Sequence, residues 1–393
     1  MKLYIQTSQE MQTITAELSE RWNGATAILS PMSLVDAKQF SDEMRKYGGQ
    51  VMFDPHMYSS NQACFKATRS FLPEYDVIDM EKDNIDCVLD YVSKVNDLIG
   101  SDTFIIPSQM LTDYDKWHTL QAQASSLVKK YANKRKTLQT IALPFSPTID
   151  EWMIENVLDS VYQWDSDGVY IVFEHPHQDY FVDDFVWLRN LMTLVGGIKR
   201  DNKEVVVGYA NQQLLCLSLA KCDAIALGDS SFDGCKLHAL GTPESDYIRR
   251  TTTRYYHPKT YSEYTIAFLD LACKADATEV LKLSPYMKNP FSDVLFKGAR
   301  PSSTTYGYDD SLKHYLNCLK IQCEVATKST FEQTFNNIMY LMDAAIIRME
   351  RLREKGIKGQ ERDFIKIADV IEWVATQFYQ ESGYVMSRAW DSI

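Results

Sequence analysis

The sequence of 393 residues is 45% hydrophobic and 24% charged, values close to globular averages, so it excludes a disordered or fibrous chain. Its formal net charge of −12 argues against a generally cationic nucleic-acid binder, which usually carries a basic domain or stripe. No segment approaches the roughly 18 consecutive apolar residues of a membrane span, so we expect no membrane partner.

The amino-terminal and cysteine patterns bear on the compartment. Met1–Gln6 lacks the apolar core of a secretory signal. The eight cysteines are scattered, and no two of them have the C-x-x-C spacing of a redox or zinc motif. We therefore expect a cytoplasmic protein with reduced, buried thiols.

Short apolar segments, each ending in a polar or proline-containing turn, alternate with helical stretches along much of the chain. Seven of them are Ala25–Ser30, Gln50–Phe53, Thr103–Ile106, Leu138–Leu143, Gly168–Phe173, Glu204–Val207 and Asp223–Leu227. A parallel barrel requires this rhythm, because each buried strand needs a helical crossover to return in the same direction. We expect Val280–Leu283 to be the eighth strand, and the first twenty-odd residues to plug or flank the barrel as a short strand and a helix.

Helical periodicity and capping residues predict the crossovers between these strands. Thr148 or Asp150 can cap a helix that ends near Trp164. The other predicted helices are Asp36–Tyr47, Asn84–Ile99, Trp117–Ala132, Asp183–Val195 and Gln212–Ala220.

The pattern divides the chain into two regions. Residues 1–300 are predicted to form an α/β domain, a TIM-type (β/α)8 barrel, with an insertion around residues 230–275. Residues 301–393 are predicted to be an all-helical extension, with helices near 311–327, 331–355 and 362–380. Helical appendages of this kind often mediate association. We therefore expect a homo-oligomer, or a protein partner, to use the C-terminal helices.

Polar residues follow most of the predicted strands. In a parallel barrel the loops after the strands build the active site. We predict that Asp54, Asp229 and Glu174 are catalytic acids, because paired carboxylates can divide acid, base and nucleophile roles. The predicted substrate-binding residues at the same rim are His56, Gln109, His175, His177 and Asn211. The alternative interpretation is that these loops are polar only because they are exposed.

The segment Glu174-His175-Pro176-His177 also carries the residue types of a divalent metal site. Imidazole and carboxylate groups suit zinc, iron or manganese, and alternate residues of a strand share a face. The proline places the two histidines in a loop, however, and no second ligand motif accompanies them. A divalent metal at His175 and His177 is therefore an alternative, and no metal is assigned.

Cations and aromatic rings alternate in the segment Arg249–His257. Proteins hold single-stranded or flipped nucleotides by placing arginine against a phosphate and stacking tyrosine on a base. We predict nucleic-acid contacts by Arg249, Arg250, Arg254 and Tyr255, against the alternative that this segment is structural.

The order of three segments in the second half of the predicted barrel can be compared with a known barrel family. They are Asp167–Tyr170 leading to Glu174, then Val205–Ala210, and then Ala220–Ala226. Over Asp167–Gly228 this order resembles the barrel of the tRNA-guanine transglycosylases, including the relatives that insert deazaguanines into DNA. The chain departs from that family at its catalytic motifs. Phe53-Asp54-Pro55-His56 stands where the family has Asp-Ser-Gly-Gly-Phe-Gln, the nucleophilic aspartate aligns with Ala226, and the zinc-binding cysteine cluster is absent.

The resemblance implies a nucleobase or nucleic-acid ligand, with Asp54 and Asp229 in place of the family's paired acids. Glu174 and Gln109 would then read the base. The leading hypothesis is a transglycosylase-like barrel protein that acts on or recognises a nucleic acid or nucleoside base. Two alternatives stay open: a metal-dependent hydrolase or lyase with a His/carboxylate site, and a catalytically decayed barrel that serves as a sensor or scaffold in a complex.

Overall fold

The computed structural model describes residues 1–59, 85–228, 252–359 and 362–393. Of the predicted site residues, Asp229, Arg249 and Arg250 lie outside the described residues. The remaining ones can be placed.

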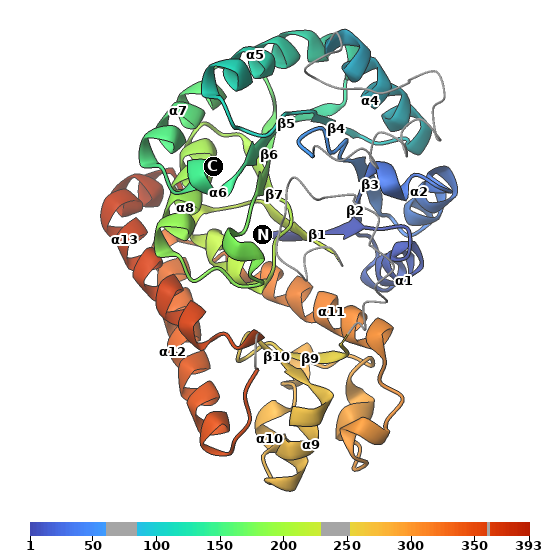
Figure 1. The fold of residues 1–393 in the computed structure, drawn as a ribbon, viewed down its shortest axis with the longest axis vertical. Coiled ribbons are helices and arrows are strands. Elements are labelled where there is room, and N and C mark those ends of the chain that lie inside the picture. The colour runs from blue at the N-terminus through green and yellow to red at the C-terminus, as the bar shows by residue number, and fades with distance from the viewer. Residues whose placement is uncertain (60–84, 229–251, 360–361) are drawn as a thin grey trace.

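Eight parallel strands form a nearly closed barrel in the upper part of the molecule (Figure 1). The strands are β1 (Lys2–Thr7), β2 (Thr26–Leu29), β3 (Gln50–Phe53), β4 (Thr103–Ile106), β5 (Lys136–Leu143), β6 (Gly168–Phe173), β7 (Glu204–Val207) and β8 (Ala224–Leu227). They follow one another around the ring in chain order, and β1 pairs with β8. The ends of this sheet, β3 and β4, lie against each other without joining into one ladder. The predicted barrel is thus confirmed, together with its seven strand segments from Ala25–Ser30 to Asp223–Leu227.

Two strand predictions were wrong. The amino-terminal segment does not plug the barrel but is one of its strands, β1. It pairs with β2, where Tyr4 lies opposite Thr26, and with β8, where Lys2 lies opposite Ala224. The expected eighth strand at Val280–Leu283 instead overlaps the short helix α10 (Thr278–Leu281). Because β1 completes the ring, the barrel strands end at Leu227.

Helices return the chain between most of the strands and cover the outside of the barrel. They are α1 (Gln12–Trp22), α2 (Ala37–Lys46), α4 (Ile85–Ile99), α5 (Tyr114–Tyr131), α6 (Phe145–Thr148), α7 (Glu151–Val161), α8 (Phe185–Arg200) and the 3-10 helix Gln212–Ala220. The predicted cap at Asp150 is present, since its side chain accepts a hydrogen bond from the Met153 amide at 3.3 Å.

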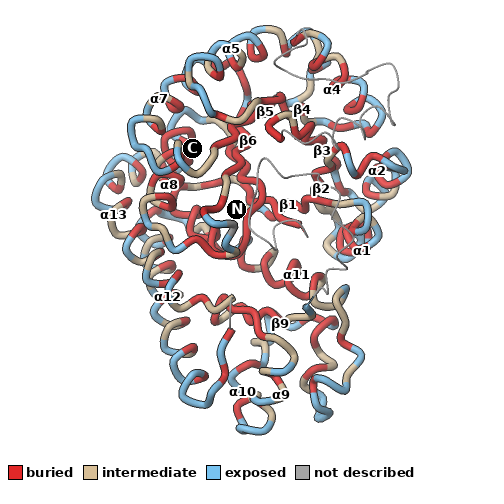
Figure 2. The backbone as a smooth tube through the Cα atoms, viewed as in Figure 1, coloured by how far each residue is buried: buried red, intermediate tan, exposed pale blue. Residues whose placement is uncertain are grey.

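Alternation along the strands sends one set of side chains into the barrel and the other outward against the helices. The inward set includes Tyr4, Ile28, Met52, Tyr170 and Ala226, all buried in one cluster. The strands are therefore buried on both faces, as the red backbone at the centre of Figure 2 shows. The barrel interior is a packed core, and a ligand site has to lie at one of its ends.

The rest of the described chain builds a smaller lobe and a helical flank. The hairpin of β9 (Arg254–His257) and β10 (Ser262–Thr265) lies below the barrel with α9 (Ile266–Lys274) and α10 (Figure 1). Short 3-10 turns follow at Pro285–Met287, Asp293–Phe296 and Pro301–Ser303.

Three long helices connect this lobe to the barrel. α11 (Tyr308–Ala326) contacts β9 and β1, while α12 (Phe331–Glu354) runs from the barrel side down along the lobe (Figure 1). α13 (Ile365–Ala389) packs against α12 and α8. The predicted helical C-terminal region is confirmed.

None of the described helices is long and apolar enough to cross a membrane. The cysteines in the described part of the chain are free thiols, and Cys216, Cys222, Cys318 and Cys323 are buried.

Candidate functional site at the barrel mouth

A hydrogen-bonded cluster of polar side chains occupies the end of the barrel to which the carboxyl ends of the strands point. Its members come from β1, from β6 and from the segments after β3 and β7, and they are Gln6, Asp54, His56, Tyr58, Tyr170 and Tyr209. All six are buried. This is the end at which barrel enzymes place their active sites.

Asp54 directly follows β3 and is 1% exposed. Its Oδ1 accepts a hydrogen bond from the His56 amide at 3.1 Å, and its Oδ2 accepts one from the Tyr58 hydroxyl at 2.7 Å. Burial, followed by the charge of Asp54, raises the pKa of Tyr58 well above its ordinary value, so Tyr58 stays a hydrogen-bond donor. Both oxygens of Asp54 therefore act as acceptors, which is the arrangement that suits an ionised carboxylate.

The imidazole of His56 joins Asp54 to Tyr209. Its Nε2 lies 2.6 Å from the Tyr209 hydroxyl and 3.5 Å from Oδ2 of Asp54. Burial lowers the pKa of His56 below its ordinary value, and the nearby Asp54 charge opposes that shift. His56 is therefore a neutral ring near pH 7. Its Nδ1 is buried and has no hydrogen-bond partner among the described residues.

Tyr209 and Gln6 extend the cluster across the barrel. The Tyr209 amide donates to Oε1 of Gln6 at 2.8 Å, and Nε2 of Gln6 donates to the Tyr170 hydroxyl at 3.0 Å. His56 and Tyr209 both have a φ of +53°, a left-handed conformation that bulky residues rarely adopt. Backbone strain of this kind costs on the order of 1–3 kcal/mol and persists where the surrounding structure holds it, often at ligand sites.

The free space beside this cluster is small. A cavity of about 50 Å³ is lined by Asp54, His56 and Tyr209 together with residues of β1 and β2. Pockets for drug-sized ligands begin near roughly 300 Å³. In the conformation described here, a ligand larger than a few water molecules would need Tyr209 or a neighbouring side chain to move.

Glu174 and His175 follow β6 and are engaged in packing. Oε2 of Glu174 accepts from the Phe145 amide at 3.4 Å, and the Trp187 indole donates to the Glu174 carbonyl at 3.2 Å. Nδ1 of His175 lies 3.0 Å from the Asp179 carbonyl oxygen, and its ring meets the Trp187 ring edge-on at 5.6 Å. Burial lowers the pKa of His175. These contacts fix the turn after β6, and no described contact joins the two residues to the Asp54 cluster.

The other rim residues are also separate from that cluster. His177 is exposed with a φ of +53°, and Gln109 is half-buried. Asn211 caps the following 3-10 helix, because its Oδ1 accepts from the Gln213 amide at 2.8 Å while its Nδ2 donates to the Tyr180 carbonyl at 2.6 Å. Within the described ranges no three His, Cys, Asp or Glu side chains converge as a metal site would require. The metal hypothesis at His175 and His177 gains no support.

The proposed nucleic-acid segment includes β9, and one of its residues is placed otherwise than expected. Tyr255 is fully buried, with its hydroxyl donating to the Leu281 carbonyl at 2.7 Å. Its ring stacks on His314, with centroids 4.9 Å apart. The prediction that Tyr255 stacks on a base is therefore wrong, because its faces are already covered. Arg254 is half-buried, and its carbonyl accepts from the Tyr306 and Ser311 hydroxyls.

Sequence reasoning missed four of the six residues of the barrel-mouth cluster. Gln6, Tyr58, Tyr170 and Tyr209 were not predicted as site residues. The available signals were weak: Gln6 is a polar residue at the end of an apolar strand, and Tyr209 lies in the turn after β7. Only the closure of the ring brings Gln6 and Tyr209, which are 203 residues apart, into contact.

Comparison with known proteins adds little to this picture. No protein-family model matches the chain, and no curated protein matches it. Two solved structures that resemble it are the tryptophan synthase A-subunit from the hyperthermophile Pyrococcus furiosus and a mutant of the corresponding subunit from the same organism. Each is 13% identical with a TM-score of 0.28; they cover 57% and 58% of this chain, and the matches span 85% and 86% of their own. The barrel is therefore assigned from its own strand order.

Proposed function

We propose that the barrel mouth is an acid–base site for a small polar ring, with a nucleobase or nucleoside as the substrate class. The observation that carries this proposal is the buried chain Asp54–His56–Tyr209, in which one nitrogen of a neutral imidazole is engaged and the other has no described partner. A neutral imidazole with an unengaged lone pair can accept a proton.

The geometry supports a specific division of roles. With the proton of His56 on Nε2, that nitrogen donates to the Tyr209 oxygen, and Nδ1 presents a lone pair that can accept a proton from a ligand. The Asp54 carboxylate, 3.5 Å from Nε2, would stabilise the imidazolium that then forms. Tyr58, hydrogen-bonded to Asp54, positions the carboxylate.

A planar nitrogenous ring is favoured because the mouth combines amide and carboxylate hydrogen-bonding groups with tyrosine rings. Gln6 offers a donor and an acceptor, Asp54 offers acceptors, and an aromatic face can stack on a base. The narrower hypothesis is base exchange at a glycosidic bond, with Asp54 and Asp229 as the acids. It is supported by the family resemblance and by the buried, accepting state of Asp54.

The test measures base exchange and base binding separately. The intact protein is incubated with radiolabelled guanine and either bulk tRNA or duplex DNA, and incorporated label is counted. Guanine binding is measured by calorimetry. We expect Asp54→Asn to abolish exchange and to weaken guanine binding at least about 10-fold, a change of about 1.4 kcal/mol. Asp102→Asn, an exposed aspartate preceding β4, is the matched control. Full exchange and binding in Asp54→Asn would refute the assignment.

A second candidate function is a catalytically decayed barrel that senses a ligand or serves as a scaffold. It is favoured by the small cavity of about 50 Å³ and by Ala226, which is buried inside the barrel where the resembling family carries its nucleophile. The same experiment separates the two, since a sensor would bind guanine with no incorporation, and Asp229→Asn would then change nothing measurable.

A further inference from the structure

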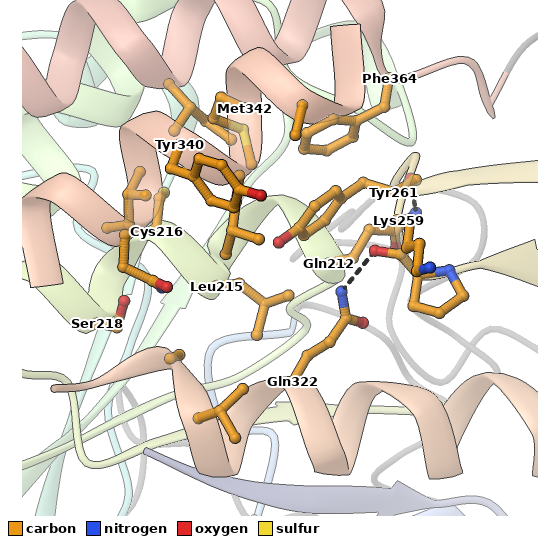
Figure 3. A pocket seen from close by; sticks show the side chains of 18 of the residues that line it. Gln212, Leu215, Cys216, Ser218, Lys259, Tyr261, Gln322, Tyr340, Met342 and Phe364 are labelled. Carbon is orange, nitrogen blue, oxygen red and sulfur yellow. Dashed lines mark hydrogen bonds between the residues drawn. The ribbon is translucent and has the colours of Figure 1, made fainter. Parts of the chain in front are cut away.

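A second pocket, much larger than the barrel-mouth cavity, lies between the barrel and the C-terminal helices. Its volume is about 410 Å³, within the range of pockets that hold small molecules. Its walls come from the 3-10 helix after β7, the turn between β9 and β10, α11 and α12, with Phe364 and α13 beside them (Figure 3). It is made of different side chains from the barrel mouth, so it is a distinct candidate site.

The charge of the lining is unexpected for this chain. Three cationic residues, Lys259, Lys328 and Arg348, line the pocket, and no aspartate or glutamate does. The whole chain has 53 acidic and 41 basic residues, so an all-basic lining runs against the composition. None of the three makes an ion pair with a residue in the described ranges. Unpaired cations around a concave apolar surface attract an anion.

Two of these cations, Lys259 and Arg348, affect the same buried histidine. The charges of Lys259 and Arg348 both lower the pKa of buried His257, after the larger effect of burial itself. Both residues also line the pocket, Lys259 from the turn between β9 and β10 and Arg348 from α12. The pocket therefore presents a cation from each of two walls to an anionic ligand.

The rest of the lining is mainly apolar and aromatic. It includes Leu215, Tyr261, Met342 and Phe364, which Figure 3 shows around the cavity. The rings of Tyr261 and Phe364 stack with centroids 5.1 Å apart. Tyr261 also has a φ of +51°, so the hairpin turn holds a strained residue at the pocket wall. This surface suits a planar or apolar body.

Hydrogen bonds hold the wall in place. Gln322 on α11 accepts from the Tyr256 hydroxyl at 2.8 Å and donates to the Pro258 carbonyl at 3.0 Å, which fixes the turn that carries Lys259. Gln212 donates to the Tyr261 carbonyl at 3.1 Å. A wall fixed in this way loses little entropy when a ligand binds. In addition, the buried hydroxyl of Ser218 lines the pocket without a hydrogen-bond partner among the described residues.

We propose that this pocket binds a small-molecule anion with an aromatic or apolar body, its carboxylate or phosphate held by Lys259 and Arg348 and its body packed against Tyr261 and Leu215. The proposal does not depend on the function of the barrel mouth. The ligand would tie the hairpin lobe to the barrel, because it would contact the 3-10 helix Gln212–Ala220 and the turn between β9 and β10 at once.

The test uses three probes that share the same naphthalene ring system and differ only in the head group. They are 2-naphthoate, 2-naphthyl phosphate and the neutral 2-naphthamide. Affinities are measured by calorimetry with the full chain. We expect at least one anion to bind about 10-fold or more tightly than the amide, because only an anion gains from the two cations. The tighter of the two anions identifies whether the natural head group is a carboxylate or a phosphate.

Variants locate the binding. In the double variant Lys259→Gln/Arg348→Gln the anion should lose its advantage while the amide keeps its affinity. Lys366→Gln, an exposed lysine on α13 outside the pocket lining, is the matched control and should leave all affinities unchanged. Ala344→Trp, which puts a large ring into the pocket, should abolish binding of every probe. Equal affinities for amide and anions, a preference that survives the double variant, or no binding of any probe would each overturn the proposal.

Discussion

His314 on α11 offers a quantitative test of the electrostatics of the lobe. The ring is fully buried, its Nε2 lies 2.7 Å from the Tyr256 carbonyl oxygen, and it stacks on Tyr255. Burial lowers the pKa of His314 to about 4, from an ordinary value of 6.5, although the Tyr256 hydrogen bond opposes the shift. The perturbation we propose is His314→Gln, which retains a polar side chain and removes the titration.

The direction of the effect follows from proton linkage. Below pH 6.5 the unfolded chain binds a proton at this histidine, whereas the folded chain does not bind it until about pH 4. The stability that His314 contributes is therefore present above pH 6.5 and is lost as the pH falls from 6.5 towards 4. At about 1.4 kcal/mol per pH unit for one proton, the loss between pH 7.5 and 5 is about 2 kcal/mol. Burial also lowers the pKa values of His56, His175 and His257, so they add to the acid sensitivity of the native protein.

The assay is urea-induced unfolding at pH 7.5, 6.5, 5.5 and 5. His314→Gln is expected to be less stable than the native protein at pH 7.5, because it loses ring packing, but to lose about 2 kcal/mol less on acidification. The exposed His177→Gln is the matched control and should reproduce the native pH dependence. If the native protein and His314→Gln lose stability in parallel, the reasoning is refuted, whatever their absolute stabilities.

Two further predictions concern the close packing at Gly228 and the buried ion pair between Arg362 and Glu263. A Cβ at Gly228 would lie 1.9 Å from the Gln6 carbonyl oxygen, so Gly228→Ala should cost roughly 1–3 kcal/mol or more in unfolding free energy by forcing β8 and β1 apart. Gly307→Ala, where the nearest atom is 4.0 Å away, should cost about 1 kcal/mol at most in the same urea titration. Arg362→Met should destabilise the fold by about 3–5 kcal/mol, because it leaves the buried Glu263 carboxylate without the guanidinium 2.7 Å away. Adding Glu263→Gln to that variant should restore part of the loss, and an unchanged loss would show that the charge is not the cause.

The C-terminal association remains an untested prediction. Exposed aromatic side chains, including Tyr340, Trp373 and Tyr384, do lie on α12 and α13. Light scattering of the purified chain would measure whether it is a monomer or an oligomer.

The amino-acid sequence determined the barrel because its evidence is local. A strand that is buried on both faces is a short run of apolar residues. Because neighbouring strands are parallel, a helix has to separate each run from the next. The strands Gln50–Phe53 and Gly168–Phe173 could therefore be delimited from their own residues. Asp150 was recognisable as a cap for the same reason, since the bond it makes reaches only three residues along the chain. Asp54 and His56 were predicted at the rim because they directly follow a strand.

Tertiary structure decided what each polar residue meets. Gln6 belongs to the site only because β1 enters the ring between β2 and β8, and Tyr209 meets His56 across 153 residues of sequence. Tyr255 cannot stack on a base as predicted, because His314 of α11 covers its ring. The large pocket likewise exists only where the 3-10 helix, a hairpin turn and α12 converge. Such contacts join segments that are distant in sequence, and no local pattern of hydrophobicity or spacing encodes them; only the packing of the folded chain does.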